Sequence, residues 1–82
     1  MSDQELQHII TKSRDAKHGG FGVLSTSEKL AAALVLNRPD WLAEMNYTLA
    51  EAIERVGPVW LTLIPNAARE LEYEDERAAG KA

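Results

Sequence analysis

The chain has 82 residues, which is the length of one domain, and 45% of them are hydrophobic, enough for one core. It contains no cysteine, which excludes disulfide bonds and thiolate–zinc sites and favours a reducing compartment. The formal net charge of −4 disfavours a nucleic-acid partner, and the longest apolar run, residues 30–36, is too short to cross a bilayer. We therefore expect a cytoplasmic protein with neither a signal peptide nor a membrane span.

The first predicted element is a helix over residues 3–17. Ser2 and Glu5 match the capping-box pattern that begins helices, and apolar residues then follow at helical spacing. Their stripe is narrow, so we expect this helix to pack at the edge of the domain. The following segment, residues 19–22, contains three glycines, but their spacing fits neither of the common nucleotide-binding glycine motifs. We interpret it as a hinge between two helices.

A second helix is predicted to begin at another capping box, formed by Ser25 and Glu28. Residues 29–36 are apolar almost all round, which is typical of a helix that is buried on most of its faces. We expect this helix to be the centre of the core. The residue before a proline avoids the helical conformation, so the helix should end ahead of Pro39.

Two shorter helices should follow. Residues 39–45 have a proline in the first turn, and Asn46 suits a left-handed cap after them. Thr48 and Glu51 form a third capping box, and the helix that they begin should end at Gly57. Its apolar residues lie on one face, which predicts that this face is buried. The predicted core consists of Leu30, Leu34, Leu36, Leu49, Ile53 and Val56.

Residues 59–64 are apolar or β-branched and lie between two prolines, a pattern that fits a strand or a short buried helix. We predict a helix, because Pro58 suits a first helical turn and a lone strand would have no stable partner. Asn66 should then cap a last helix. Beyond Tyr73 the apolar periodicity ends, so we divide the chain into one helical domain, residues 1–73, and a charged, disordered tail, residues 74–82.

Together these elements predict an all-α protein, a compact orthogonal array of four to six short helices, with a possible short extended segment at 59–64.

One stretch resembles a known class of protein. Residues 47–57, which read Tyr-Thr-Leu-Ala-Glu-Ala-Ile-Glu-Arg-Val-Gly, are similar to the first helix and turn of helix-turn-helix DNA-binding proteins. The resemblance implies a DNA-binding regulator. However, Ile53 stands where that class keeps a small residue, and the segment after the turn is apolar instead of polar and basic. We therefore keep a degenerate helix-turn-helix regulator as the alternative function.

The sequence shows no constellation of catalytic residues. With two histidines and no cysteine, we expect no enzyme activity, no cofactor and no metal site. Tryptophan is rarely buried completely and is enriched at protein interfaces. We therefore predict a non-catalytic interaction or accessory protein that binds another protein or itself. Its candidate interface residues are Trp41, Met45, Trp60 and Leu61, with Trp60 nearer the core and Trp41 nearer the surface.

Overall fold

The computed structural model describes residues 2–80, and side-chain environments for residues 4–77. The described chain is mostly helical and contains no strand, which confirms the all-α prediction. Its helices are α1 (Ser2–Asp15), α2 (Thr26–Val35), α3 (Pro39–Glu44), α4 (Leu49–Val56) and α5 (Pro58–Gly80). A π-helical turn (Ala16–Gly20) and a 3-10 turn (Phe21–Val23) connect α1 to α2. Residues 59–64 belong to α5, so the helical prediction for this segment was right.

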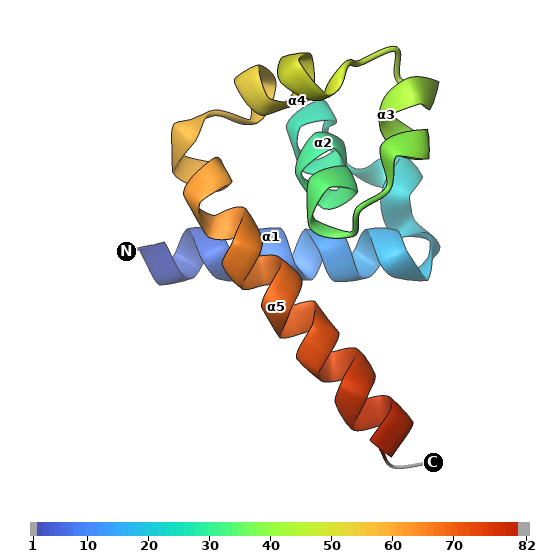
Figure 1. The fold of residues 1–82 in the computed structure, drawn as a ribbon, viewed down its shortest axis with the longest axis vertical. Coiled ribbons are helices and arrows are strands. Elements are labelled where there is room, and N and C mark those ends of the chain that lie inside the picture. Colours follow the sequence, from blue (N-terminus) through green and yellow to red (C-terminus); the bar gives the residue numbers. More distant parts are fainter. Residues whose placement is uncertain (1, 81–82) are drawn as a thin grey trace.

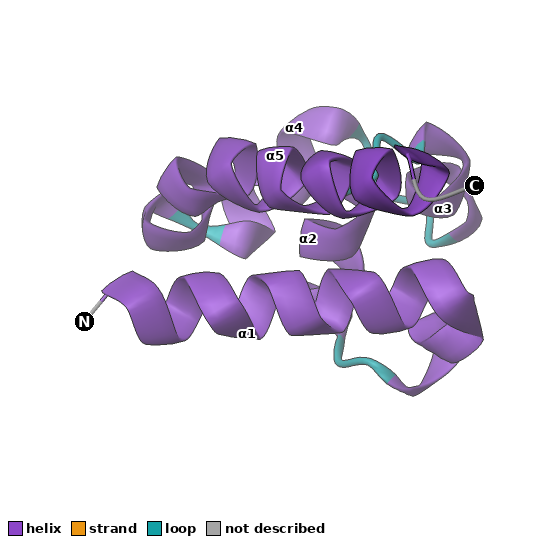
Figure 2. Ribbon diagram, turned by 90° about the horizontal axis from the view of Figure 1, so that it is seen from below, coloured by secondary structure: helices purple, strands orange, loops and turns teal. Residues whose placement is uncertain are grey.

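The helices form two layers with α2 between them. In Figure 1, α5 crosses in front of α1, and Figure 2 shows α1 on one side of α2 and α4 and α5 on the other. Four consecutive residues of α2, from Leu30 to Ala33, expose 2% or less of their surface. The prediction that this helix is the centre of the core is therefore confirmed.

Small residues let the neighbouring helices approach α2 closely. Ala32 forms a buried cluster with Ala16 and Leu24, whereas Ala33 belongs to a second cluster that includes Ala52 of α4. A third cluster joins α1, α2 and α5. It comprises Ile9, Ile10, Val35, Leu63, Ala67 and Leu71. Since interiors are packed to crystal-like density, the alanines at these contacts set the distances between the helix axes.

Two of the predicted capping boxes are present. The Ser25 hydroxyl accepts a hydrogen bond from the Glu28 N–H (3.2 Å), and the Glu28 carboxylate accepts one from the Ser25 N–H (2.9 Å). Thr48 and Glu51 repeat the arrangement at 3.1 and 2.9 Å. The predicted box at Ser2 lies outside the residues whose side chains the structure describes.

Asparagines in the left-handed conformation end α2 and α3. Asn37 has φ +55° and Asn46 has φ +61°. After α2, the N–H of Arg38 donates to the carbonyl of Ala33 (2.8 Å), the long hydrogen bond of a Schellman motif. The left-handed cap predicted at Asn46 is confirmed. The end of α2 was expected from Pro39, but Asn37 already reverses the chain before it.

The predicted edge position of α1 is only partly right, because α1 is an outer helix but its apolar stripe is closely packed. Ile9 and Ile10 expose 1% and 3% of their surface, and α1 packs against both α2 and α5. Ser13 and Ala16 extend the buried face by two further turns, at 1% and 3% exposure. The stripe seemed narrow because serine and alanine do not register as strongly apolar, although both fit where helices come close.

The predicted core on α4 is also largely wrong. Ala52 is fully buried and Val56 is half-buried, but Leu49 and Ile53 are 59% and 41% exposed. Leu34 and Leu36 of α2 are only half-buried as well. The reason is that α4 touches α2 through Ala52, a small residue, so the larger side chains on either side project past the contact.

Helix α5 continues through Pro65, so the predicted break with a new cap at Asn66 is wrong. A proline inside a helix removes one hydrogen bond and costs about 3 kcal/mol. Packing outweighs that cost here, because Leu63, Ala67 and Leu71 are each 8% exposed or less and form one buried face across the proline.

Residues 74–80, the described part of the predicted tail, form the last turns of α5. Their side chains reach back to the first helix: Glu74 pairs with Arg14, and Asp75 pairs with Lys17. The rest of the predicted tail, residues 81–82, lies outside the described residues. A domain boundary at Tyr73 stays a prediction.

Candidate interaction surface

The described chain exposes a pair of large aliphatic side chains on α4. Leu49 and Ile53 lie one helical turn apart and therefore point to the same side. Leu49 also borders a groove of about 290 Å³ between the end of α2, α3 and α4. Apolar side chains and Tyr47 form most of its walls: Leu34, Pro39, Leu42, Ala43 and Tyr47. We call Leu49, Ile53 and this groove the α4 surface.

The turn ahead of α4 and the contact of α4 with α2 hold this surface in place. The left-handed Asn46 turns the chain after α3, and the N–H of Tyr47 donates to the carbonyl of Leu42 at 2.9 Å. Two residues later the capping box at Thr48 starts α4 in a fixed direction. With Ala52 anchored against α2, the rotation of α4 about its axis is set, and Leu49 is left facing outward.

Tyr47 separates the groove from a more polar depression. Asn46, Glu51, Glu54 and Arg55 line this depression together with Tyr47. The Arg55 guanidinium donates to the Tyr47 hydroxyl at 3.3 Å. Two carboxylates therefore face one guanidinium here, and the depression next to the α4 surface carries an excess of negative charge.

The positive charge of Arg38, at the opposite end of the groove, is already compensated. Its guanidinium donates to both carboxylate oxygens of Asp40, at 3.0 and 2.8 Å, and lies 4.4 Å from the centre of the Trp41 ring. Hydrogen bonding to Arg38 lowers the pKa of Asp40 and keeps it ionised. On the other side, Trp41 packs against Phe21 with 4.4 Å between ring centres.

The structure does not bring the four predicted interface residues into one patch. Trp41 and Met45 pack around Leu42 at the α3 end of the molecule, whereas Trp60 and Leu61 lie in the first turn of α5 on the opposite side of α2 (Figure 1). Both tryptophans are half-buried, so burial does not separate them as expected.

Sequence reasoning missed the exposure of Leu49 and Ile53. Their spacing was read correctly as one face of a helix, but the same spacing describes a face turned to the core and a face turned to a partner. Only the contact through Ala52 distinguishes the two, and that contact depends on α2, which is distant in the sequence.

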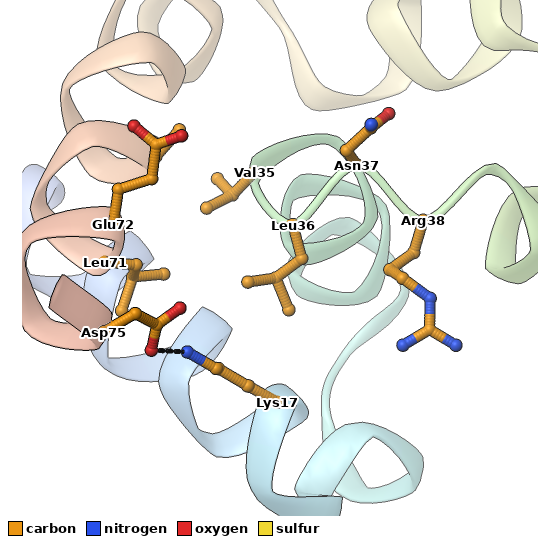
Figure 3. A pocket seen from close by; sticks show the side chains of 9 residues that line it. Lys17, Val35, Leu36, Asn37, Arg38, Leu71, Glu72 and Asp75 are labelled. Atoms are coloured by element: carbon orange, nitrogen blue, oxygen red, sulfur yellow. Dashed lines mark hydrogen bonds and ion pairs between the residues drawn. The ribbon is translucent and has the colours of Figure 1, made fainter. Parts of the chain in front are cut away.

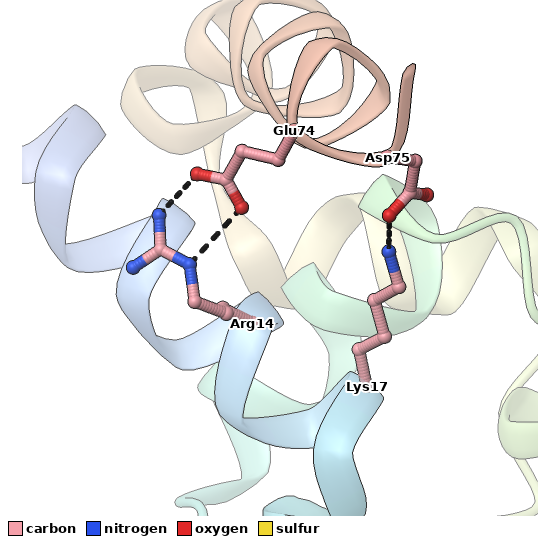
Figure 4. A network of polar contacts seen from close by, with 4 residues as sticks. All are labelled: Arg14, Lys17, Glu74 and Asp75. Carbon is pink, nitrogen blue, oxygen red and sulfur yellow. Dashed lines mark hydrogen bonds and ion pairs between the residues drawn. The ribbon is translucent and has the colours of Figure 1, made fainter. Parts of the chain in front are cut away.

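A second set of polar contacts joins α1 to the far half of α5 (Figure 4). The Arg14 guanidinium donates to both oxygens of Glu74, its Nε at 3.1 Å from Oε1, and Lys17 pairs with Asp75. The hydrogen bonds from Arg14 lower the pKa of Glu74. All four side chains are partly exposed, so these contacts orient the two helices and contribute little stability.

His8 connects α1 to the start of α2. Its Nε2 lies 2.8 Å from Glu28 Oε2, and its ring centre lies 5.7 Å from that of Trp60. The pKa of Glu28 is lowered, first by the hydrogen bond from the Ser25 N–H and then by His8 and the charge of Lys12. This carboxylate therefore serves both as the cap of α2 and as a link to α1.

Within residues 4–77, no three histidine, cysteine or acidic side chains come together in a way that would hold a metal ion. The hydroxyl of Ser13 is buried between the helices and has no hydrogen-bond partner in the described part of the chain. None of the described helices combines the length and hydropathy that crossing a membrane requires.

No known protein family matches this chain, and neither do any curated protein or solved structure.

Proposed function

We propose that this protein is a non-catalytic interaction module whose α4 surface binds an amphipathic helix of a partner protein, one with basic residues along its flank. The observation that carries the proposal is the exposure of Leu49 (59%) and Ile53 (41%) on one face of α4, beside an apolar groove. The lack of cysteine favours a reducing compartment, and we place the interaction in the cytoplasm.

Two adjacent aliphatic side chains next to a groove suit the helix-in-groove mode of recognition. In that mode a partner helix inserts anchors spaced by one turn into an apolar depression. Fully burying one leucine or isoleucine contributes about 1.5–3 kcal/mol. Burial of Leu49 and of Ile53 against the partner would each contribute part of this free energy. The groove walls at Leu34 and Leu42 would add further apolar contact. Val23 is even more exposed, at 89%, but it belongs to the 3-10 turn and not to this helix face.

The charge around the α4 surface supports a basic partner. Glu51 and Glu54 lie in the neighbouring depression against Arg55 alone, and Arg38 is compensated by Asp40. A helix with lysines or arginines beside its apolar stripe would meet opposite charge there, which speeds association and selects the partner. A second copy of this chain carries the same net charge of −4, so electrostatics disfavours self-association.

The test uses a fluorescein-labelled peptide of leucine and lysine, with leucines at helical spacing, and measures fluorescence anisotropy. The full-length protein should bind it, and Leu49→Ser with Ile53→Ser should weaken binding by about tenfold or more, as loss of two interface anchors does. The matched control is Val59→Ser, which removes a similarly exposed side chain (56%) at the start of α5 and should change nothing.

Three outcomes would contradict the proposal. Equal binding of a scrambled peptide of the same composition would reduce the interaction to charge alone. A leucine and glutamate peptide binding equally would remove the basic partner. Finally, if sedimentation shows a dimer that the Leu49→Ser and Ile53→Ser variant dissociates, the occupant of the surface is a second copy of the chain.

A further inference from the structure

A second groove, of about 340 Å³, lies between the end of α2, the π-helical turn after α1 and the far half of α5 (Figure 3). Its floor is apolar and consists of Val35, Leu36, Ala68 and Leu71. The groove shares Asn37 and Arg38 with the α4 surface, so the two depressions lie on either side of the turn that ends α2. This volume is in the range of small ligand pockets and would hold one long side chain.

The charges on the rim leave one carboxylate available. The groove is lined by four charged residues, and both of its cations are compensated: Lys17 pairs with Asp75, and Arg38 pairs with Asp40, which lies outside the lining. Glu72, on the α5 wall opposite Asn37, makes no ion pair within the described part of the chain (Figure 3). The uncompensated charge of the groove is therefore negative, and it lies above an apolar floor.

The end of α2 adds to the preference for a cation. In a continuing helix the carbonyl of Val35 would accept the N–H of the residue four positions later, but that residue is Pro39, which has no N–H. The C-terminal end of a helix also carries the negative end of the helix dipole. The end of α2 and Glu72 therefore form two different walls of the groove, and both favour positive charge.

We propose that this groove binds a lysine side chain presented by the partner helix. The aliphatic stem would lie on Leu36 and Leu71, and the ammonium would reach Glu72. A lysine suits this arrangement because its flexible aliphatic stem can lie along the apolar floor while its compact ammonium stays at the rim beside Glu72. This inference rests on the proposed function for the source of the lysine, but its test does not involve the α4 surface.

The experiment titrates Nα-acetyl-lysine methylamide into the full-length, ¹⁵N-labelled protein and follows the backbone amide shifts. The amides of Leu36, Asn37 and Glu72 should move together and saturate. Glu72→Gln should weaken binding by about threefold, as expected for a solvent-exposed ion pair, and Glu72→Lys should abolish it. Glu70→Gln is the matched control, because Glu70 is an exposed carboxylate on the same helix that does not line the groove, and it should bind like the wild type.

Two results would overturn the inference. The first is an equal shift with the Nε-acetylated probe, which keeps the stem and lacks the charge. The second is equal weakening by Glu70→Gln and Glu72→Gln, which would indicate a diffuse effect of net charge. The variant with Leu49→Ser and Ile53→Ser should still bind the lysine probe, so failure of the groove and failure of the α4 surface can be told apart.

Discussion

Helices α2 and α4 begin with the same local structure, but they differ in how much of their apolar surface is exposed to solvent. Each starts with a complete capping box, at Ser25 and at Thr48, and each carries several apolar residues. Yet α2 buries Leu30 completely, whereas α4 leaves Leu49 59% exposed. The difference lies in their neighbours, because α2 packs against α1, α3, α4 and α5, while α4 lies on the outside of α2.

The comparison shows that a capping box and an apolar face determine that a helix forms, but not how much of it is buried. The burial of α4 depends on Ala52, whose small side chain lets the helix rest on α2. The larger residues on its flanks remain available for contact outside the molecule. Each of the following predictions tests one part of this contrast, from the largest expected effect to the smallest.

Truncating the large residue of each helix should give the largest difference. Leu30→Ala removes a fully buried side chain and should lower the free energy of unfolding by about 2–5 kcal/mol. Leu49→Ala removes an exposed one and should cost less than about 1 kcal/mol. Urea denaturation followed by circular dichroism measures both. Equal losses would show that α4 is more deeply packed than its exposure indicates.

Enlarging the contact residue should destabilise the protein by a smaller amount. Ala52→Leu forces extra volume between α4 and α2 and should cost about 1–3 kcal/mol. Ala50→Leu, on the exposed side of the same helix, is the control and should leave the urea midpoint nearly unchanged. If Ala52→Leu is tolerated as well, the two helices are not held at a fixed distance.

The left-handed caps on either side of α3 provide the third test. Asn37→Ala and Asn46→Ala should each cost about 1 kcal/mol, because an alanine pays the steric penalty of positive φ in full. Asn37→Gly and Asn46→Gly should recover the stability, since glycine adopts this conformation freely. Thermal unfolding by differential scanning calorimetry would measure the series. If the alanine and glycine variants melt together, the conformation of these residues is not what ends the helices.

Acid should affect the start of α2 through Glu28, with the smallest effect of the four. Its pKa in the folded protein lies below the ordinary value of 4.5, because the Ser25 N–H, His8 and Lys12 favour the carboxylate. The resulting stabilisation is complete above the unfolded pKa and is lost as the pH falls through the lower, folded pKa. Urea unfolding below pH 5 should therefore show a shallower loss of stability for Glu28→Gln than for the wild type. If the two proteins lose stability equally as the pH falls, the charge of Glu28 does not contribute to the stability of the folded protein.

Local features were predictable from the sequence, whereas the choice of buried face was not. The boxes at Ser25 and Thr48 and the cap at Asn46 depend on residues within a few positions of one another, and all three are present. The exposure of Leu49 depends on how Ala52 meets α2, which is a contact between distant segments. The path of α5 through Pro65 has the same cause, since its buried face against α1 outweighs a local rule.

The sequence predicted that the protein has an interaction surface, but not which residues form the α4 surface. Aromatic residues were expected at an interface, but Trp41 packs on Phe21 and Arg38, and so part of its area is already covered. Asn37, in the turn that ends α2, lines both the groove of the α4 surface and the second groove. Residues from several helices form each of these two grooves. No pattern within one helix indicates a groove that several helices form together.

The packing of α1 on α5 has a consequence for how the chain folds during its synthesis. Ile9 and Ile10 are covered by Leu63, Ala67 and Leu71, residues that follow them by more than fifty positions. During synthesis these isoleucines lack the part of their native cover that α5 supplies until residues 63–71 have been made, because contacts so distant in sequence cannot form earlier. A nascent or prematurely terminated chain that ends before α5 therefore displays the apolar face of its first helix to solvent, where chaperones and proteases recognise incomplete proteins.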